Sequence, residues 1–374
     1  MFGRSRAPGR IFDAVNRYYE IAADIRRAAT LPGEFYRDDQ VFEALRERVF
    51  ARSWQWIGHE SDLAAESAMP LVLLEGCLDI PLVLTRDQKG ELRCLSNVCT
   101  HRGNLIATVP GGCKTLRCRY HGRRFQLNGK FDSMPEFEGA LDFPSEADDL
   151  PQLPLESSLG FLFTSLEPAA PLHSLVAELE AHIGHLPVAE ARLDPARSRD
   201  YTFNANWALY LDNFLEGFHV PFVHPGLTES LDYDSYRTEL FPLASLQVGA
   251  AKGAGPLIEL RSGATPSGEE VAAAYFWLYP NTMFNVYPWG ISVNVVQPLA
   301  IDRTRVSFYS YVWNSALLEA GAGGALDQVE LEDETVVEQV QRGIRSRLYR
   351  RGRYSPTRET AVHHFHRLLT SALE

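Results

Sequence analysis

The chain has 374 residues, of which 45% are hydrophobic and 22% are charged, so it can bury a sizeable core and is not expected to be disordered. Its net charge of −12 argues against a broad surface for nucleic acids or anionic membranes, because phosphate binding depends on clustered Lys and Arg. Five cysteines do not make a disulfide framework, and the odd count favours a reducing compartment, the cytoplasm. Residues 1–27 lack the apolar region of a signal peptide, and no run of about 18 apolar residues predicts a membrane span.

The first half of the chain predicts a helical segment followed by a small all-β domain. Apolar residues recur at helical spacing within residues 40–52, so residues 1–52 are taken as an N-terminal helical segment that packs with the catalytic domain. Residues 53–165 contain short β runs bounded by Gly, Pro, Asp or Asn. These runs lie at 70–76, 80–86, 91–99, 115–125 and 159–166.

The second half, residues 166–374, predicts an α+β domain. A Pro-flanked helix within residues 166–186 is expected to connect the two domains. Beta runs at 272–288, 291–300 and 304–313 are followed by helices, which indicates an antiparallel sheet wrapped on helices, a helix-grip-like arrangement. Residues 318–328, LEAGAGGALDQ, are predicted to form a flexible loop before the last helix.

Two Cys/His pairs stand out in the predicted β domain. Cys99 and His101 form a C-x-H pair, and Cys118 and His121 form a C-x-x-H pair 16 residues further on. Each pair closes a short chelate loop, so the four side chains can hold one tetrahedral metal or one small cluster. Ordinary buried thiols and surface imidazoles are one alternative, and structural zinc, which uses the same ligands, is a stronger one.

This stretch, with HRG around the first pair and YHG at the second, resembles the Rieske motif. The resemblance implies a [2Fe–2S] cluster whose inner iron is held by Cys99 and Cys118 and whose outer iron is held by His101 and His121. Because its ligand shell is closed, such a cluster relays electrons and does not bind oxygen. Cys113 lies outside the motif and is expected to be a small apolar filler.

A second constellation lies in residues 206–227, NWALYLDNFLEGFHVPFVHPGL. His219 and His224 would point about 140° apart on a regular helix, so they could not share a face. Pro221 and Pro225 are predicted to bend or end the helix and to let the two imidazoles converge.

This segment resembles the mononuclear iron motif of Rieske non-haem iron oxygenases, which implies that His219 and His224 bind Fe(II). In that family a late Asp that opens a helix completes a 2-His-1-carboxylate face with open positions for oxygen and substrate. Asp333 is the expected third ligand, and Glu330, Glu332 and Glu334 are neighbouring alternatives. A solvated acidic helix start, stabilised by the helix dipole, would look the same in the sequence.

Glu216 occupies the bridging position of the family, where a carboxylate joins His121 of the partner subunit to His219. Most members have Asp there, whereas some members that act on quaternary ammonium compounds have Glu, as this chain does. Members of the family are rings of three in which one subunit's cluster lies beside the next subunit's iron, so the resemblance implies a homotrimer.

The two resemblances together imply an oxygenase α subunit that uses O2 to hydroxylate a small organic substrate. No G-x-G-x-x-G follows a predicted strand, so electrons from NAD(P)H are expected through a separate reductase, with a ferredoxin as an optional intermediary. Basic residues around the cluster loops would dock an acidic donor or would only solvate the loops: Arg102, Lys114, Arg117, Arg119, Arg123 and Arg124.

The substrate is predicted from the end of the chain and from its aromatic residues. Residues 337–369 resemble choline monooxygenase and its betaine-demethylating relatives, which makes N-methyl oxidation the first expectation and aromatic hydroxylation the second. Aromatic faces attract a quaternary cation by about 0.5–2 kcal/mol each, although they also stack on aromatic rings. The candidate pocket residues are Tyr210, Phe214, Phe218, Phe222, Trp277, Tyr279, Phe284, Tyr287 and Trp289.

Two hypotheses from other classes remain, an electron carrier with a degenerate second domain and a zinc-stabilised binding module. The presence of both constellations disfavours the first, and the absence of a four-Cys or zinc-finger spacing disfavours the second. Three late histidines, His363, His364 and His366, are expected to pack and cap the last helix and not to form a further metal site.

Overall fold

The structure is a computed structural model that describes residues 19–226, 232–252, 255–261, 269–324 and 326–374. The chain divides into two compact units, one formed by Ala51–Leu172 and the other by Met1–Phe50 together with His173–Glu374. Of the N-terminal segment expected to be helical, residues 1–18 lie outside the described part of the chain.

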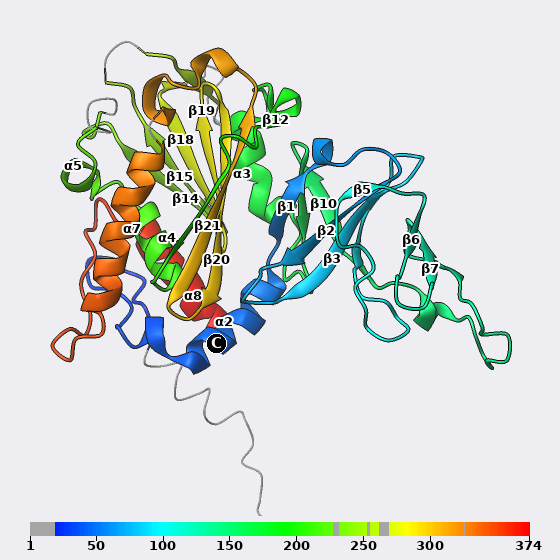
Figure 1. Cartoon of the computed structure of the whole chain (residues 1–374). Helices are drawn as coiled ribbons and strands as arrows, with labels where there is room; N and C mark the ends of the chain where they lie inside the picture. Colours follow the sequence, from blue (N-terminus) through cyan, green and yellow to red (C-terminus); the bar gives the residue numbers. More distant parts are fainter. Residues whose placement is uncertain (1–18, 227–231, 253–254, 262–268, 325) are drawn as a thin grey trace, which may run out of the picture. The chain divides into compact units, whose positions relative to one another are not determined.

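The unit Ala51–Leu172 is built from short antiparallel strands, and the predicted all-β domain is confirmed (Figure 1). Its sheets have the strand orders β1-β11-β10, β5-β2-β3-β4-β9 and β6-β7-β8. The strands are β1 (Gln55–His59), β2 (Ser67–Leu73), β3 (Ile80–Arg86), β4 (Leu92–Ser96), β5 (Gly111–Gly112), β6 (Thr115–Arg117), β7 (Arg124–Gln126), β8 (Phe131–Ser133), β9 (Gln152–Leu153), β10 (Leu155–Ser158) and β11 (Phe161–Thr164).

Apolar residues of these strands form two cores, one of which supports the Cys/His loops. Leu116 of β6 and Phe125 of β7 are buried in a cluster that also contains the side chains of Cys99 and Cys118. Cys113 packs partly buried against the same cluster, as a small filler would. The loops that carry the ligand candidates are therefore anchored by their own thiols in the hydrophobic core.

The second unit is organised around an eight-stranded antiparallel sheet of order β12-β21-β20-β19-β18-β15-β14, with β13 also paired to β21. The strands are β12 (Arg192–Leu193), β13 (Arg199–Phe203), β14 (Arg237–Phe241), β15 (Ala244–Gly249), β18 (Ala273–Leu278), β19 (Thr282–Tyr287), β20 (Gly290–Ala300) and β21 (Arg303–Val312). The predicted runs correspond to β18–β21, whereas β13 and β14 escaped prediction because charged residues interrupt them. A separate hairpin pairs β16 (Ile258–Leu260) with β17 (Glu269–Val271).

Helices cover both faces of this sheet (Figure 1). Neighbouring residues of β18 point to opposite faces, and Trp277 contacts Phe365 of α8 whereas Phe276 contacts His182 of α3. The predicted α+β class is therefore confirmed. The helices are α2 (Asp39–Arg48), α3 (His173–Ile183), α4 (Trp207–Phe214), α5 (Val220–Val223), α7 (Leu326–Gly343) and α8 (Thr360–Leu373).

The late histidines belong to the packing of α8. His366 is 1% exposed, and its two ring nitrogens contact Asp212 Oδ1 and the Tyr354 hydroxyl, both at 2.7 Å. His363 Nε2 lies 2.8 Å from the Ala22 carbonyl oxygen. These contacts tie the end of the chain to α4 and to the N-terminal segment, as the packing interpretation predicts. The expected capping is wrong, because all three histidines lie inside α8.

The prediction of a flexible loop over residues 318–328 is wrong for the residues described. A 3₁₀ turn forms at Gly321–Gly323, and α7 already begins at Leu326. Leu318 and Leu326 pack against a cluster that includes Trp289. Glycine-rich composition predicted mobility here, but neighbouring apolar side chains hold the segment against the sheet. Among the described helices, none is both long enough and apolar enough to cross a membrane.

Candidate metal centres

The two Cys/His loops repeat one local turn. The backbone N–H of Gly103 donates to the Cys99 carbonyl at 3.0 Å, and that of Gly122 donates to the Cys118 carbonyl at 3.1 Å. Both glycines have positive φ, +72° and +79°, a conformation that L side chains rarely adopt. The glycines thus let each loop double back beneath its ligand candidates.

The structure brings the four predicted side chains together in two pairs, the thiols with each other and the imidazoles with each other. The Cys99 and Cys118 thiols are in hydrogen-bonding contact and are only 3% and 2% exposed. The His101 and His121 rings lie with centroids 4.8 Å apart and planes at 71°, and both residues are partly exposed. This arrangement has two thiols on the inside and two imidazoles on the outside.

The surroundings of these side chains fit a bound cluster. Burial alone would raise the pKa of the Cys118 thiol, but hydrogen bonds from the backbone of Tyr120 and from the Asn104 side chain help to bring the pKa below its ordinary value. The Asn104 amide lies 3.5 Å from Cys118 Sγ. Burial, followed by the nearby His121 ring, lowers the pKa of His101. Burial raises the pKa of the Cys99 thiol, so of the two thiols Cys118 is the favoured thiolate. A thiolate and a neutral imidazole are the forms that bind metal.

Arg123 does not belong to an exposed docking patch, and this part of the sequence interpretation is wrong. Its side chain is 2% exposed and pairs with Asp148 at 2.7 Å. The guanidinium carbon also lies 5.0–5.6 Å from the ring centroids of Phe125, Phe131 and Phe143. The other basic residues near the loops are exposed: Arg102, Lys114, Arg117, Arg119 and Arg124.

Arg123→Met is expected to lower the free energy of unfolding by about 2–4 kcal/mol, because it leaves Asp148 without its partner in a poorly solvated place. Denaturant unfolding of the wild type and variant, followed by circular dichroism, measures this loss. Arg124→Met is the matched control, because Arg124 is exposed and pairs with Asp132 at 3.2 Å. Its expected cost is about 1 kcal/mol or less. Equal costs for the two variants would contradict a structural role of Arg123.

The pH dependence of this pair has a definite sign. The hydrogen bond from Arg123, opposed by burial, lowers the pKa of Asp148. The stabilisation of the fold by the Arg123–Asp148 pair is therefore fully present above the pKa of Asp in the unfolded chain. It is lost as the pH falls through the lower pKa of Asp148 in the folded protein. The gap between the wild type and Arg123→Met is expected to shrink in acid.

The histidine pair flanks a very short helix. Helix α4 ends at Phe214, and a turn over Leu215–Phe218 leads to α5, which has a single turn. His219 is the residue before α5 and His224 the residue after it. The predicted break is confirmed, but it comes before both prolines, so Pro221 and Pro225 do not end the first helix. Because α5 has only one turn, its two ends can present side chains to the same point.

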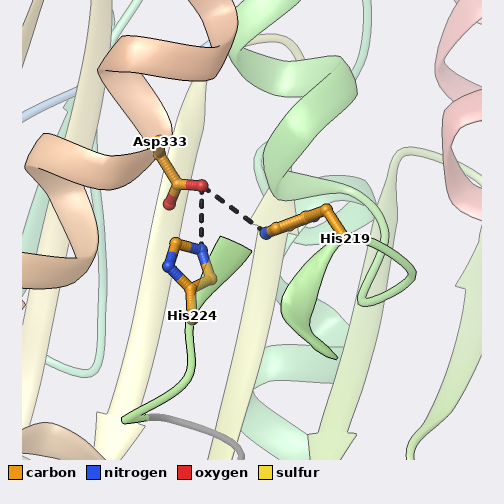
Figure 2. Close-up of side chains that lie close together, drawn as sticks. All are labelled: His219, His224 and Asp333. Atoms are coloured by element: carbon orange, nitrogen blue, oxygen red, sulfur yellow. Dashed lines mark hydrogen bonds and ion pairs between the residues drawn. The ribbon is translucent and has the colours of Figure 1, made fainter. Parts of the chain in front are cut away.

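Figure 2 shows how Asp333 of α7 meets the two imidazoles. Its Oδ1 atom lies 3.0 Å from His224 Nε2 and 3.5 Å from His219 Nε2. The three ligand atoms lie within 4.8 Å of one another, and among the described residues this is the one such His/Cys/Asp/Glu group. Asp333 lies well inside α7, which begins at Leu326, so the expectation that it opens a helix is wrong.

Carboxylates and an amide orient the three side chains from behind. His219 Nδ1 lies 2.7 Å from Glu216 Oε1, and His224 Nδ1 lies 2.7 Å from Glu332 Oε2. The Asn213 amide donates to Asp333 Oδ1 at 2.7 Å. Both imidazoles therefore present Nε2 inward, which is the pattern of metal-binding histidines with carboxylate partners.

The charges of the site also fit a divalent cation. Burial alone would lower the pKa of His224, but the hydrogen bonds and charges of Asp333 and Glu332 outweigh it and raise the pKa. The carboxylates therefore concentrate negative charge where the imidazole ligand atoms converge. Two imidazoles and one carboxylate with room on the remaining side match a non-haem Fe(II) site.

The acidic neighbours of Asp333 have other contacts. Glu332 supports His224, as described above. Glu330 is buried and accepts a hydrogen bond from the Tyr210 hydroxyl at 2.7 Å. Burial, with a smaller contribution from Glu338, raises the pKa of Glu334. Of the four acidic residues that the sequence offered as third ligand, the structure places Asp333 alone beside both imidazoles.

A cavity of about 110 Å³ adjoins the three residues. Of the predicted aromatic residues, Tyr210, Phe214 and Tyr287 line it, and Trp289 stacks on Tyr287 from behind with ring centroids 5.2 Å apart. The sequence analysis missed further lining residues of the sheet, because adjacent strands must be in register before their shared face is known. They are Gln247, Tyr275, Asn285, Asn294 and Phe308, and Tyr236, just before β14, lines the cavity with them.

Several predicted pocket residues lie elsewhere. Phe218 and Phe222 are 42% and 79% exposed. Trp277 does not line the cavity and contacts Tyr279 and the Phe365 ring of α8. Phe284 alternates with Asn285 and therefore points to the opposite face of β19. Aromatic content alone could not separate these positions from the true lining.

Comparison with known proteins matches a separate family to each of two parts of the chain. Residues 53–153 match the family described as Rieske [2Fe-2S] domain, and residues 190–374 match the family described as ring hydroxylating alpha subunit (catalytic domain). The chain is 32% identical to choline monooxygenase of Arabidopsis thaliana, an alignment that covers 92% of this chain and 83% of that protein. It is 31% identical to the carnitine monooxygenase oxygenase subunit of Escherichia coli K12, with coverage of 94% and 96%.

Solved structures agree in fold. A crystal structure of a quaternary ammonium Rieske monooxygenase superposes with a TM-score of 0.77 at 26% identity, covering 94% of this chain and 96% of that one. Naphthalene 1,2-dioxygenase from Rhodococcus sp. has a TM-score of 0.74 at 18% identity over 97% of both chains, which shows the fold alone. The chain therefore belongs to the Rieske non-haem iron oxygenases, as an α subunit that carries a Rieske [2Fe–2S] cluster and a mononuclear iron.

Proposed function

We propose that this oxygenase hydroxylates an N-methyl group, or the carbon next to it, of a quaternary ammonium compound. In such a reaction the substrate C–H and O2, with two electrons and two protons, give a hydroxylated carbon and water. An N–CH2OH product then loses formaldehyde and a proton to leave the tertiary amine, and hydroxylation of another carbon attached to the nitrogen releases the corresponding aldehyde by the same C–N cleavage. The electrons come from NAD(P)H through a separate reductase, and we propose a ferredoxin as an optional intermediary.

The observation that carries this proposal is the composition of the cavity beside the iron site. Tyrosine faces and carboxyl groups surround it, and its described lining includes neither Lys nor Arg. Aromatic faces and carboxylates both stabilise a cation that cannot donate hydrogen bonds. The names of the relatives, choline monooxygenase and carnitine monooxygenase, support the same substrate class.

Hydroxylation of an aromatic substrate is the second candidate. The same tyrosine and phenylalanine side chains could stack on an aromatic ring. Against this candidate, Glu216, Glu330 and Asp333 all border the cavity. An uncharged hydrocarbon would remove water from these carboxyl groups and would make no interaction that offsets the free-energy cost.

Oxygen consumption with an added reductase tests the proposal. Choline, glycine betaine and L-carnitine are compared with toluene and naphthalene under identical conditions, and formaldehyde and hydroxylated products are assayed. Quaternary ammonium compounds are expected to stimulate oxygen uptake together with product formation. If only toluene or naphthalene gives a product, aromatic hydroxylation is the better assignment and the proposed function is wrong.

We propose that residues 53–165 form the domain that holds the cluster and that residues 166–374 form the domain that holds the iron. The segment 1–52 is proposed to pack on the iron-binding domain. Cys99, Cys118, His101 and His121 are the proposed cluster ligands. His219, His224 and Asp333 are the proposed iron ligands. None of the five cysteines, all of which lie in the described part of the chain, forms a disulfide, which supports the proposal of a reducing compartment such as the cytoplasm.

The assembly proposed is a homotrimer in which Glu216 links His219 to His121 of the partner subunit. Support comes from the contact of Glu216 Oε1 with His219 Nδ1 and from the partial exposure of the carboxylate, whose side chain is 12% accessible. A carboxylate placed behind an iron ligand can accept a second imidazole N–H from outside. Sedimentation analysis of the purified protein measures the number of subunits.

Glu216→Gln is expected to reduce turnover by about 10- to 100-fold while both metal centres stay occupied, because the partner of a metal-binding imidazole is altered and not the ligand itself. Iron content, visible absorption and single-turnover product yield are measured on the same preparation. A loss of mononuclear iron in proportion to turnover would show that Glu216 acts in metal retention and not in the link between centres. Glu239→Gln, at a partly exposed carboxylate on β14, is the control and should leave all three readouts unchanged.

A further inference from the structure

Glu330 is a buried carboxyl group in the wall of the cavity. It is 4% exposed, and its Oε2 atom accepts the Tyr210 hydroxyl hydrogen bond. Its other oxygen, Oε1, is buried and has no hydrogen-bond partner. Glu330 also lines the cavity beside the three ligand candidates. Oε1 of Glu330 is thus shielded from water, and no protein group donates a hydrogen bond to it in place of water.

The isolation of this group has an energetic cost that a ligand could offset. An unpaired buried acceptor costs about 1–3 kcal/mol, and more when it is charged. Burial first, and then the charge of Asp333, raises the pKa of Glu330 well above its usual range. With the cavity empty this favours the neutral acid, whereas a cation beside Oε1 would favour the ionised carboxylate. Apart from the iron site, the described lining offers no Lys or Arg as that cation.

We propose that Glu330 is the specificity residue that pairs with the cationic head group of the substrate, and that the cavity takes a quaternary ammonium compound without a carboxylate. The inference rests on the proposed function and narrows its substrate class. A trimethylammonium group cannot donate a hydrogen bond, so it needs a nearby charge and apolar or aromatic faces. Oε1 of Glu330 supplies the charge, and Tyr275 and Tyr287, with ring centroids 6.1 Å apart, supply the faces.

The exclusion of a carboxylate follows from the same lining. A carboxylate-bearing zwitterion would bring its own negative charge among Glu216, Glu330 and Asp333, and the described lining has no Lys or Arg to receive it. The other cation is the iron that His219, His224 and Asp333 would hold, and a carboxylate bound to it would occupy the open positions that oxygen needs. A hydroxyl group fits better, because the side-chain oxygen of Asn285 is also buried without a hydrogen-bond partner and can accept a hydrogen bond from it. A quaternary amino alcohol is therefore expected to bind more tightly than a quaternary zwitterion that carries a carboxylate.

Binding to the metal-loaded protein tests the assignment without turnover. Titration calorimetry under anaerobic conditions compares choline with 3,3-dimethyl-1-butanol, in which carbon replaces the charged nitrogen, and with L-carnitine. The wild type is expected to bind choline at least about tenfold more tightly than the neutral analogue, as buried charge pairs at interfaces do. Glu330→Gln keeps the shape of the side chain and an acceptor for Tyr210, and is expected to bring this ratio to within about threefold by weakening choline alone.

Two further variants separate charge from structure. Glu334→Gln makes the same charge change on α7 outside the cavity lining and should keep the wild-type ratio. Glu330→Asp keeps the charge and should retain a preference for choline even if its packing is poorer. Iron content and circular dichroism are recorded for each variant, so a misfolded or metal-poor variant is recognised and the Glu330→Asp result decides.

The outcomes distinguish the two proposals. If the wild type binds no quaternary ammonium compound, the proposed function fails at its substrate class. If the wild type prefers choline and Glu330→Gln keeps that preference, the assignment of Glu330 is overturned while the proposed function stands. If L-carnitine binds the wild type as tightly as choline, the exclusion of a carboxylate is overturned.

Discussion

Asp333→Asn is expected to remove the mononuclear iron and to leave the cluster in place. Iron should fall from about three to about two per chain, with the visible absorption of the cluster unchanged. Asn keeps the size of the side chain but loses the negative charge that would complete a 2-His-1-carboxylate site. Hydroxylation should fall below about 1% of the wild type, a greater loss than the 10- to 100-fold typical of residues behind a ligand.

Metal analysis and absorption spectra of anaerobically purified protein measure this effect. Glu332→Gln is the matched control, because Glu332 contacts His224 Nδ1 from the side away from Asp333. Its iron is expected to be bound more weakly and to be restored by excess Fe(II), whereas Asp333→Asn should not be rescued. Three irons per chain in Asp333→Asn would contradict the ligand assignment and return attention to the neighbouring acidic residues.

Cys118→Ser is expected to abolish the cluster and the electron supply together. Iron should fall from about three to about one per chain, and the reduced protein should lose its low-temperature EPR signal, because a serine hydroxyl replaces one of two thiolates. Substrate hydroxylation driven by the reductase should become undetectable. The mononuclear iron is expected to stay, since its three candidate ligands lie in the other compact unit.

Cys113→Ser provides the control for a change of thiol to hydroxyl near the cluster. Cys113 is partly buried against the same core and lies outside the Cys/His pairs, so its variant should keep colour and iron. A colourless wild-type protein containing zinc would contradict the cluster itself, and a coloured Cys118→Ser variant with full iron would contradict the role of that thiol.

The Cys/His loops were predictable because their chemistry is local. Cys99 and His101, like Cys118 and His121, are two or three residues apart, and a glycine closes each turn, so spacing alone limits what the loops can bind. The need for a break between α4 and His224 was predictable as well, because a regular helix cannot point both imidazoles the same way.

The identity of the third ligand shows where sequence reasoning stops. Glu330, Glu332, Asp333 and Glu334 lie within five consecutive residues, and any of them could serve. Which one reaches the imidazoles depends on the rotation of α7 against α4. The Asn213–Asp333 and Tyr210–Glu330 hydrogen bonds join these helices and show the rotation adopted.

Arg123 and the cavity lining show the same limit for burial. The charge of Arg123 can be read from the sequence. That it pairs with Asp148, 25 residues later, and that three aromatic rings enclose its guanidinium group cannot. Likewise Asn285 and Tyr287 share one face of β19, but only pairing with β18 and β20 brings Tyr275 and Asn294 beside them.

The sequence by itself predicted the two Cys/His pairs, the histidine pair and the α+β class, because short-range spacing and apolar patterning carry that information, and its resemblance to known motifs indicated the family. Tertiary structure alone decided which carboxylate meets the histidines, which arginine is buried and which side chains face the cavity. Those choices depend on helix rotation and strand register, which arise from contacts between residues far apart in the chain.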